Sequence, residues 1–216
     1  MARIRSVSRS ETDAPIVHAM YDLMFGKGVE PTDDGVTTTT GSPGDWWTTH
    51  ALSPDVLQHS VDGFVLYRNP ARAIDPELRE LAQARVGWSA GSTFVYSQHV
   101  QSMRGMGMDP AKIADLATWQ TSDAYTRIER AVMAYADALV LEHGRVDDDL
   151  FAVLKEELTD EAILELTYIA AMYLQHAVVT RALRLEFDDV DEHVQVIDPP
   201  EDFRPEDFVA IGRSGG

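Results

Sequence analysis

Cysteine is absent from this sequence of 216 residues. Disulfides, thiolate nucleophiles, iron–sulfur clusters and cysteine-based zinc sites are therefore excluded. The seven histidines form no HExxH motif and no other tight metal-binding spacing. We expect neither a metal site nor any other cofactor.

Basic residues are scarce. There are 18 of them against 36 acidic residues, which gives a formal net charge of −18. This charge repels nucleic-acid backbones and anionic lipid surfaces, and it also weakens long-range capture of an anionic substrate. We therefore expect no nucleic-acid or membrane partner. If the substrate is anionic, an arginine should approach its pocket, and finding none there would argue against it. The arginines considered are Arg72, Arg79, Arg85, Arg104 and Arg181.

Long apolar runs are also missing from the sequence. No stretch reaches the roughly 18 uninterrupted apolar residues of a membrane span, and no apolar leader core follows the first arginines. We expect a cytoplasmic protein that is neither secreted nor membrane-spanning.

Helix signals, in contrast, are abundant. A small polar residue followed by proline is typical of a helix N-terminus, and it recurs at Ser53-Pro54, Asp75-Pro76 and Asp109-Pro110. Thr126 and Glu129 have the spacing of a capping box. No segment alternates apolar and polar residues over more than four positions, so the fold class is all-α, a helical bundle. Helices are expected at about 15–25, 54–67, 76–88, 92–105, 110–118, 126–144, 147–157 and 159–185.

Two chemically interesting residues fall on successive predicted helices. Glu80 lies on the helix opened by Asp75-Pro76, and His99 follows nineteen residues later. At this point the sequence resembles the carboxymuconolactone decarboxylases and the related alkylhydroperoxidase D-type proteins. The peroxidase branch of that family has a glutamate, a cysteine twelve residues on, a second cysteine three later and a histidine four after that. These positions here are Glu80, Ser92, Val95 and His99.

The resemblance covers roughly residues 45–187 and implies an all-helical, homo-oligomeric protein, a trimer or a hexamer. It divides the chain into an N-terminal helix and loop extension at 1–44, a helical domain at 45–187 and an acidic C-terminal arm at 188–216. Within the extension, 26–44 is rich in Gly, Thr, Asp and Pro and is expected to form a loop or lid. The arm either lies over a neighbour or is a disordered tail.

The departure from the family pattern removes thiol chemistry. Ser92 and Val95 cannot form a disulfide, so thiol peroxidase and disulfide-reductase activities are excluded. A carboxylate beside an imidazole still forms an acid/base pair. The resemblance then favours a cofactor-free decarboxylase-type lyase acting on a small cyclic or carboxylated compound, in which His99 protonates the carbanion and Glu80 orients His99.

Residues near the pair are candidates for substrate binding, although packing alone also explains the aromatic ones. They are Ser92, Tyr96, Trp88, His50 and Trp47.

Two alternatives remain open. The same acid/base pair would serve an isomerase equally well. A redox-inactive ligand-binding or assembly protein on the same scaffold needs no catalytic pair, and a lone Glu and His are often ordinary surface or core residues. An enzyme is favoured if Glu80 and His99 face a shared pocket, and the binding or assembly protein is favoured if they do not.

Overall fold

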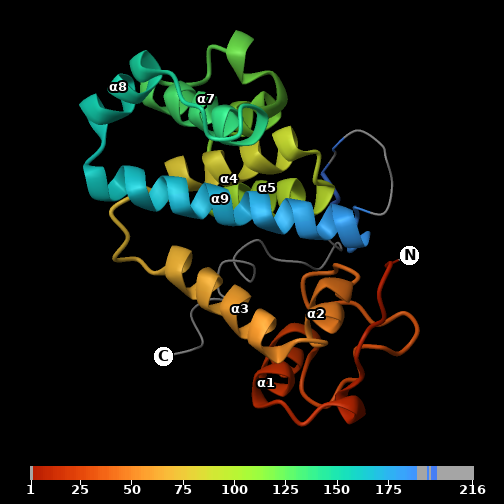
Figure 1. The fold of residues 1–216 in the computed structure, drawn as a ribbon. Coiled ribbons are helices and arrows are strands. Elements are labelled where there is room, and N and C mark those ends of the chain that lie inside the picture. The colour runs from red at the N-terminus through yellow and green to blue at the C-terminus, as the bar shows by residue number, and fades with distance from the viewer. Residues whose placement is uncertain (1, 189–193, 195, 199–216) are drawn as a thin grey trace.

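The computed structural model describes residues 2–188, 194 and 196–198. This part of the chain contains helices joined by turns and loops, and no strand (Figure 1). The helices are α1 (Pro15–Phe25), α2 (Asp45–His50), α3 (Pro54–Arg68), α4 (Pro76–Ala90), α5 (Thr93–Gly105), α6 (Pro110–Ala114), α7 (Arg127–Leu141), α8 (Asp148–Glu157) and α9 (Asp160–Leu183), with short 3₁₀ helices η1 (Arg9–Glu11) and η2 (Leu116–Thr121).

The all-α prediction is confirmed, and each predicted helix has a counterpart in the structure. Residues 26–44 contain no helix or strand, as expected of a loop. The helix predicted over 110–118 is two elements, α6 and η2. The sequence analysis missed η1 and α2. Helix α2 has six residues and follows Gly44, whose φ of 81° is left-handed and which has no capping side chain, so no local signal marks its start.

Polar N-caps begin most of the predicted helices. The carboxylate of Asp75 accepts hydrogen bonds from the first-turn backbone of α4, and Thr126 and Glu129 form the expected capping box of α7. The Thr159 hydroxyl caps α9 by accepting a hydrogen bond from the Ala162 backbone N–H at 3.1 Å, without a reciprocal bond. Ser53 occupies the N-cap position of α3, but its side chain makes no capping hydrogen bond. Proline and burial, rather than a cap, therefore define the start of α3.

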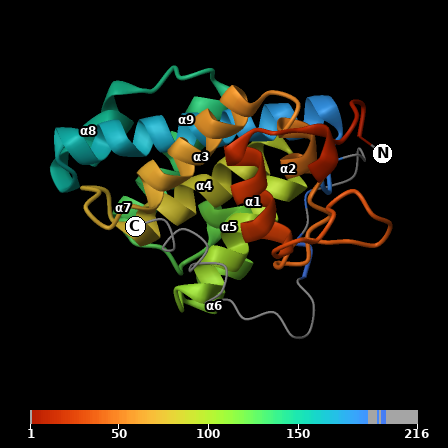
Figure 2. The same ribbon diagram turned by 90° about the horizontal axis from the view of Figure 1, so that it is seen from below.

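Helix α4 is the centre of the bundle. It packs against α5, α7 and α9, and every residue from Glu80 to Gly87 is buried. Figure 1 shows α9 crossing the full width of the molecule in front of α4 and α5, with α7 and α8 beyond them. The N-terminal elements α1, α2 and α3 form a second layer on the opposite side, as Figure 2 shows from below.

A glycine sets the distance between α4 and α5. A Cβ on Gly87 would lie 2.5 Å from the backbone nitrogen of Tyr96, so no larger residue fits between the helices. Gly91 then ends α4 at a φ of 70°, and Ser92 begins the next helix at once. The two helices consequently run back to back at close range. Positions 80 and 99, two turns before Gly87 and one turn after Tyr96, face each other.

Helix α9 is long and apolar enough to cross a membrane by length and composition. Half of its most apolar stretch is buried inside the protein, and residues such as Leu166, Ile169 and Ala177 belong to the main core. The helix therefore forms part of the protein core. A helix that is apolar on most sides is typical of such a position.

A few described residues beyond α9 lie against the side of the bundle that α5 helps to form. Val194 and Val196 pack against the apolar cluster on that side, and the backbone N–H of Ile197 donates to Ser97 Oγ at 3.0 Å. These described residues of the predicted acidic arm contact the protein's own helix. The remainder of the arm, at 189–193, 195 and 199–216, lies outside the described residues.

A polar network ties η2 to the bundle. The Arg85 guanidinium, 5% exposed, donates from Nε to Asp137 Oδ1 at 2.6 Å and from Nη2 to Oδ2 at 3.0 Å. Ser89 Oγ and Trp119 Nε1 donate to the same carboxylate, and Arg85 Nη1 donates to the carbonyl of Leu116. One carboxylate therefore accepts hydrogen bonds from four donor groups, which belong to three side chains.

Replacing that carboxylate should destabilise the protein strongly. In Asp137→Ala the buried guanidinium has no anionic partner, so we expect the free energy of unfolding to fall by about 3 kcal/mol. Urea unfolding followed by circular dichroism measures the change. Asp13→Ala, which removes an exposed carboxylate, should stay within about 0.5 kcal/mol of the parent. A loss below about 1 kcal/mol for Asp137→Ala would contradict the role assigned to the network.

Candidate active site

Glu80 and His99 form a direct hydrogen bond between α4 and α5. His99 Nδ1 lies 2.7 Å from Glu80 Oε2, and the two residues are 2% and 1% exposed. The carboxylate accepts, so Nδ1 carries the proton. The other ring nitrogen, Nε2, is buried without a hydrogen-bond partner among the described residues. The carboxylate thus fixes the tautomer of His99 and leaves Nε2 for a ligand.

Glu80 is held as a carboxylate by two neighbours. Its second oxygen accepts a hydrogen bond from Arg79 Nη2 at 2.9 Å. Burial alone would raise the pKa of Glu80, but the interactions with His99 and Arg79 outweigh it and hold the pKa below its usual value. Glu80 is therefore ionised at neutral pH and accepts the hydrogen bond of His99.

A cavity of about 540 Å³ adjoins the pair. His99 lies in its wall, and α1, α3, α5, α9 and the loop before α2 contribute the rest. Thr40 and Ser42 of the predicted 26–44 loop also line it. A volume of this size is typical of sites for small-molecule ligands. Of the two catalytic candidates, His99 borders the cavity, and Glu80 lies behind it, joined to its ring by the hydrogen bond.

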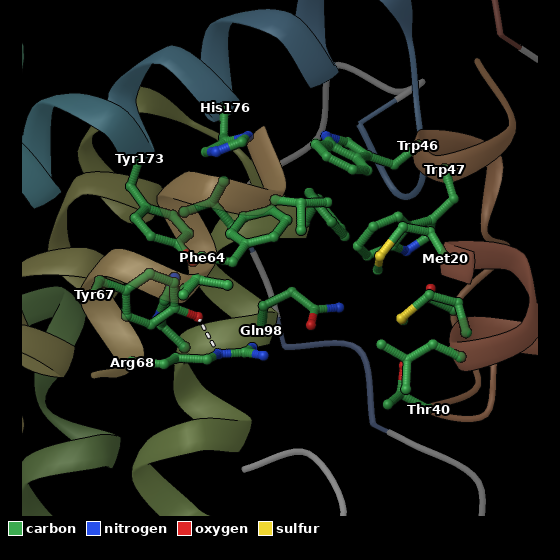
Figure 3. A pocket seen from close by; sticks show the side chains of 18 of the residues that line it. Met20, Thr40, Trp46, Trp47, Phe64, Tyr67, Arg68, Gln98, Tyr173 and His176 are labelled. Atoms are coloured by element: carbon green, nitrogen blue, oxygen red, sulfur yellow. Dashed lines mark hydrogen bonds between the residues drawn. The ribbon is translucent and has the colours of Figure 1, made fainter. Parts of the chain in front are cut away.

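Two tyrosines lie beside His99 in this cavity, and Arg68 lies next to one of them, Tyr67 (Figure 3). The ring of Tyr173 meets that of His99 edge-on, with centroids 4.2 Å apart, and the ring of Tyr67 is 6.5 Å away. Arg68 Nε donates to the Tyr67 hydroxyl at 2.8 Å. Burial, followed by the interaction with Tyr67, raises the pKa of Tyr173 well above its usual value. Its phenol consequently stays protonated.

One end of the cavity is aromatic and apolar. Trp46, Trp47 and Met20 line it (Figure 3), and the ring of Phe64 lies between this end and Tyr67, with its centroid 5.6 Å from that of Trp46 and 6.4 Å from that of Tyr67. The indole nitrogen of Trp46 is buried and has no hydrogen-bond partner among the described residues. His176 lies between these rings and Tyr173. Burial and then the nearby histidines lower its pKa to about 3, so its imidazole is neutral.

A residue beyond α9 holds the aromatic wall in place. The buried carboxyl of Glu186 accepts hydrogen bonds from the backbone N–H groups of Gly44 and Trp46, at 3.2 and 3.0 Å. Its own backbone N–H donates to Asp45 Oδ1 at 2.6 Å. Glu186 thereby caps the short helix α2, which carries both tryptophans of the cavity.

Of the five residues predicted to bind substrate, Trp47 lines the cavity. Ser92 is buried at the N-cap of α5, where its hydroxyl donates to Asp188 Oδ2 at 2.5 Å and accepts from the Val95 backbone. It is committed to capping and does not reach the cavity.

The other three predicted binding residues also lie outside the cavity lining. Trp88 and Tyr96 pack against each other in the apolar cluster on the far side of α4 and α5, with ring centroids 5.5 Å apart. His50 stacks behind Trp46 at 3.8 Å and donates from Nδ1 to the Trp46 carbonyl. The cavity lining therefore does not support substrate contacts for Ser92, Tyr96, Trp88 or His50.

The five arginines considered for an anionic substrate do not line the cavity either. Each has a partner elsewhere: Arg72 pairs with Glu165, Arg79 with Glu80, Arg85 with Asp137, Arg104 with Asp198, and Arg181 with the Gly91 carbonyl. The cavity does contain Arg68, which the sequence analysis did not name. Its signal was the spacing of Val61, Phe64 and Arg68 along one helical face.

No group of three or more His, Asp or Glu side chains in the described part of the chain is arranged to hold a metal ion. The polar groups at the cavity are instead single hydrogen-bonding side chains. Their chemistry is that of proton transfer and hydrogen bonding.

Comparison with known proteins supports the family resemblance. Residues 58–138, which span α3, α4, α5 and most of α7, match the model of the carboxymuconolactone decarboxylase family. The resemblance drawn from Glu80 and His99 is therefore confirmed, for a chain that has neither redox cysteine. No curated protein matches the sequence.

Three solved structures share the fold. The debrominase Bmp8, as a cysteine-to-alanine variant in complex with 2,3,4-tribromopyrrole, is 20% identical, with a TM-score of 0.64 and coverage of 85% of this chain and 92% of that one. An uncharacterised peroxidase-related protein with an alkylhydroperoxidase AhpD core, from Ralstonia eutropha JMP134, is 15% identical, with a TM-score of 0.60 and coverage of 97% and 98%.

The third structure is a protein of unknown function from Agrobacterium tumefaciens, a candidate antioxidant defence protein AhpD. It is 21% identical, with a TM-score of 0.57 and coverage of 63% of this chain and 93% of that one. At these identities the likeness concerns the fold alone.

The Glu186 cap should make stability depend on pH. Burial, followed by the neighbouring Asp45, raises the pKa of Glu186 from 4.5 to about 8. The folded state then holds a proton that the unfolded chain releases, so this stabilisation is complete below about pH 4.5 and is lost as the pH rises through 8. We expect the free energy of unfolding to fall between pH 5 and 8, by at most about 1.4 kcal/mol per pH unit.

Urea unfolding at several pH values in this range tests the expectation. Glu186→Gln removes the titrating group and should flatten the profile. Glu142→Gln, at an exposed carboxylate after α7, should leave it unchanged. A profile that rises from pH 5 to 8 in the parent, or one that Glu186→Gln does not alter, would contradict the assignment.

Proposed function

We propose that this protein, whose residues 58–138 match the carboxymuconolactone decarboxylase family, is a cofactor-free acid/base enzyme. Its reaction is a decarboxylase-type lyase step on a small cyclic or carboxylated compound, carried out in the cytoplasm. The observation that carries the proposal is the Glu80–His99 hydrogen bond of 2.7 Å at the wall of a cavity of about 540 Å³. Thiol peroxidase chemistry is excluded because the chain has no cysteine.

His99 is the proton donor in this proposal. Its Nδ1 is occupied by Glu80, so Nε2 is the nitrogen that meets the substrate. When carbon dioxide leaves a carboxylated substrate, an electron pair remains on the organic fragment, and Nε2–H protonates that fragment at carbon. Glu80 stabilises the imidazolium and keeps its ring in place, and Arg79 keeps Glu80 ionised.

The shape of the cavity supports a ring-containing substrate. Trp47 and Phe64 offer flat apolar surfaces in the cavity wall. The debrominase of similar fold binds 2,3,4-tribromopyrrole, which is itself a planar ring. An isomerase using the same pair would abstract and return a proton at the same site. The two reactions differ in whether carbon dioxide is released.

We also propose that the protein is a homo-oligomer, a trimer or hexamer. Apolar residues are exposed along one face of α9, with Leu164, Tyr168 and Val178 being 68%, 53% and 57% exposed. The three residues share one face of the helix, although exposed Gln175 lies between Tyr168 and Val178. Burying this face between copies removes apolar surface from water.

Light scattering of the eluting protein tests the assembly. We expect the mass of three or six chains, and a lower mass for Tyr168→Glu, which places a charge on this face of α9. Glu161→Gln, on the same helix in its exposed first turn, should keep the parent mass. A parent protein that elutes as a monomer at all concentrations would refute the assembly.

The catalytic proposal predicts a large loss of turnover on removing the proton donor. With carboxylated lactones and β-keto acids as substrates, carbon dioxide release should fall by about 10²–10⁴-fold in His99→Gln. Glu80→Gln should also lower kcat, because it keeps the shape but removes the charge that stabilises the imidazolium. His143→Gln, in an exposed turn, should retain parent turnover.

Full turnover in both His99→Gln and Glu80→Gln would refute the catalytic role of the pair. If the parent binds these compounds without converting any of them, the ligand-binding alternative replaces the enzyme. Conversion without carbon dioxide release would identify an isomerase.

A further inference from the structure

Arg68 is the one arginine or lysine among the described residues that line the cavity. It is half-buried at the last position of α3. Its guanidinium lies over the Tyr67 ring, with Cζ 5.3 Å from the centroid, and donates from Nε to the Tyr67 hydroxyl. Neither terminal nitrogen donates to a described protein group. The guanidinium is thus positioned by Tyr67, and its terminal nitrogens can still donate hydrogen bonds to a ligand.

The arginine and the proposed proton donor share one end of the cavity. Tyr67, which holds Arg68, has its ring 6.5 Å from that of His99 and 5.5 Å from that of Tyr173. Figure 3 shows Arg68 extending from Tyr67 toward the cavity interior. A ligand of a few heavy atoms across therefore reaches both the guanidinium and the imidazole.

We propose that Arg68 binds the substrate oxygen on which negative charge develops, and that the substrate is a singly charged, ring-containing keto acid. This inference rests on the proposed proton transfer at His99. It assigns the group that stabilises the negative charge, whereas His99 delivers the proton. Tyr67 is a positioning residue, because it acts through Arg68.

The movement of charge explains why a cation belongs at this oxygen. As the carbon–carbon bond to the carboxylate breaks, carbon dioxide leaves and the electron pair moves through the conjugated system onto the carbonyl oxygen, which becomes an enolate. The electron pair then returns to carbon, which takes the proton of His99. Solvent restores that proton, so the reaction consumes one proton and releases one carbon dioxide.

A cation at the enolate oxygen stabilises the charge that forms, whereas a cation at the departing carboxylate would stabilise the charge that disappears. Only the first arrangement favours the transition state over the bound substrate. Arg68 therefore serves the reaction at the carbonyl, and the carboxylate leaves from the less polar part of the cavity.

The remaining lining defines the rest of the substrate. Met20, Phe64 and Trp47 provide apolar surface for a ring system, and a single guanidinium offsets one unit of negative charge. With a net charge of −18 on the chain, a second anionic group on the substrate has no lysine or arginine in the lining to meet. The geometry thus favours a monoanion with a bulky apolar body over a compact dianion.

Phenolates test this assignment without turnover, because a phenolate resembles an enolate in shape and charge. The probe is 4-nitro-1-naphthol, whose anion absorbs visible light, and 1-nitronaphthalene is the matched compound without the hydroxyl. Absorbance titrations over pH give the pKa of the bound naphthol. We expect binding to the parent protein to lower that pKa by about one to three units relative to free naphthol, as an adjacent cation does.

Variants separate Arg68 from other causes of the shift. Arg68→Met should abolish the downshift while leaving 1-nitronaphthalene binding unchanged, and Arg68→Lys should restore part of it. Tyr67→Phe should weaken the shift, because Arg68 loses its positioning hydrogen bond. Arg104→Met removes a guanidinium that lies outside the cavity lining and pairs with Asp198, so it should behave as the parent. Thermal unfolding confirms that each variant is folded.

The lowered pKa of the bound naphthol should persist in His99→Gln, because that variant keeps Arg68. The pKa measurement therefore tests the role of Arg68 separately from the proton transfer by His99. A downshift that survives Arg68→Met, an absent downshift in the parent, or no binding of either compound would overturn the assignment of Arg68. Loss of turnover in His99→Gln would in those cases still support the acid/base pair on its own.

Discussion

The close approach of α4 and α5 at Gly87 is the constraint on which the rest of the structure depends. Helices normally pack with their axes 8–10 Å apart, and small residues permit the shortest separations. Because Tyr96 nitrogen occupies the space where a Cβ would lie, the two helices cannot slide or separate without losing the core. Glu80 and His99 are therefore brought together by backbone packing, and their hydrogen bond needs no loop or lid to form it.

Burying this pair has a cost that the surrounding residues offset. An isolated carboxylate inside a protein is strongly disfavoured, but Glu80 has both His99 and Arg79 as partners. Tyr67, whose carbonyl accepts a hydrogen bond from Arg79 at 2.8 Å, links this ionic group to α3. The same residue touches Arg68 through its hydroxyl. A single tyrosine thus connects the inner acid/base pair with the cationic end of the cavity.

Sequence reasoning was most reliable where a local interaction determines structure. Proline, caps and apolar spacing depend on neighbouring residues, so most helices were predictable. The Glu80–His99 pair was predicted instead from its match to the spacing of the family signature. Helix α2 was missed because its cap is Glu186, more than a hundred residues away. The substrate-facing residues failed for the same reason. Arg68 lines the cavity because of the way α3 crosses the bundle. Arg85, on α4, is instead paired with Asp137, because α7 packs against α4. Neither arrangement is a local property of the sequence.

The two positions that carry sulfur in the peroxidase branch have been taken over by the fold. Ser92 is bound to Asp188 at the start of α5, and Val95 is 1% exposed within the main core. A cysteine placed at 92 would meet a carboxylate, which disfavours the reactive thiolate. A cysteine at 95 would exchange a packed hydrocarbon for a buried thiol. A single cysteine at either position would therefore meet surroundings that disfavour the reactive thiolate, so redox chemistry does not follow from introducing one sulfur alone.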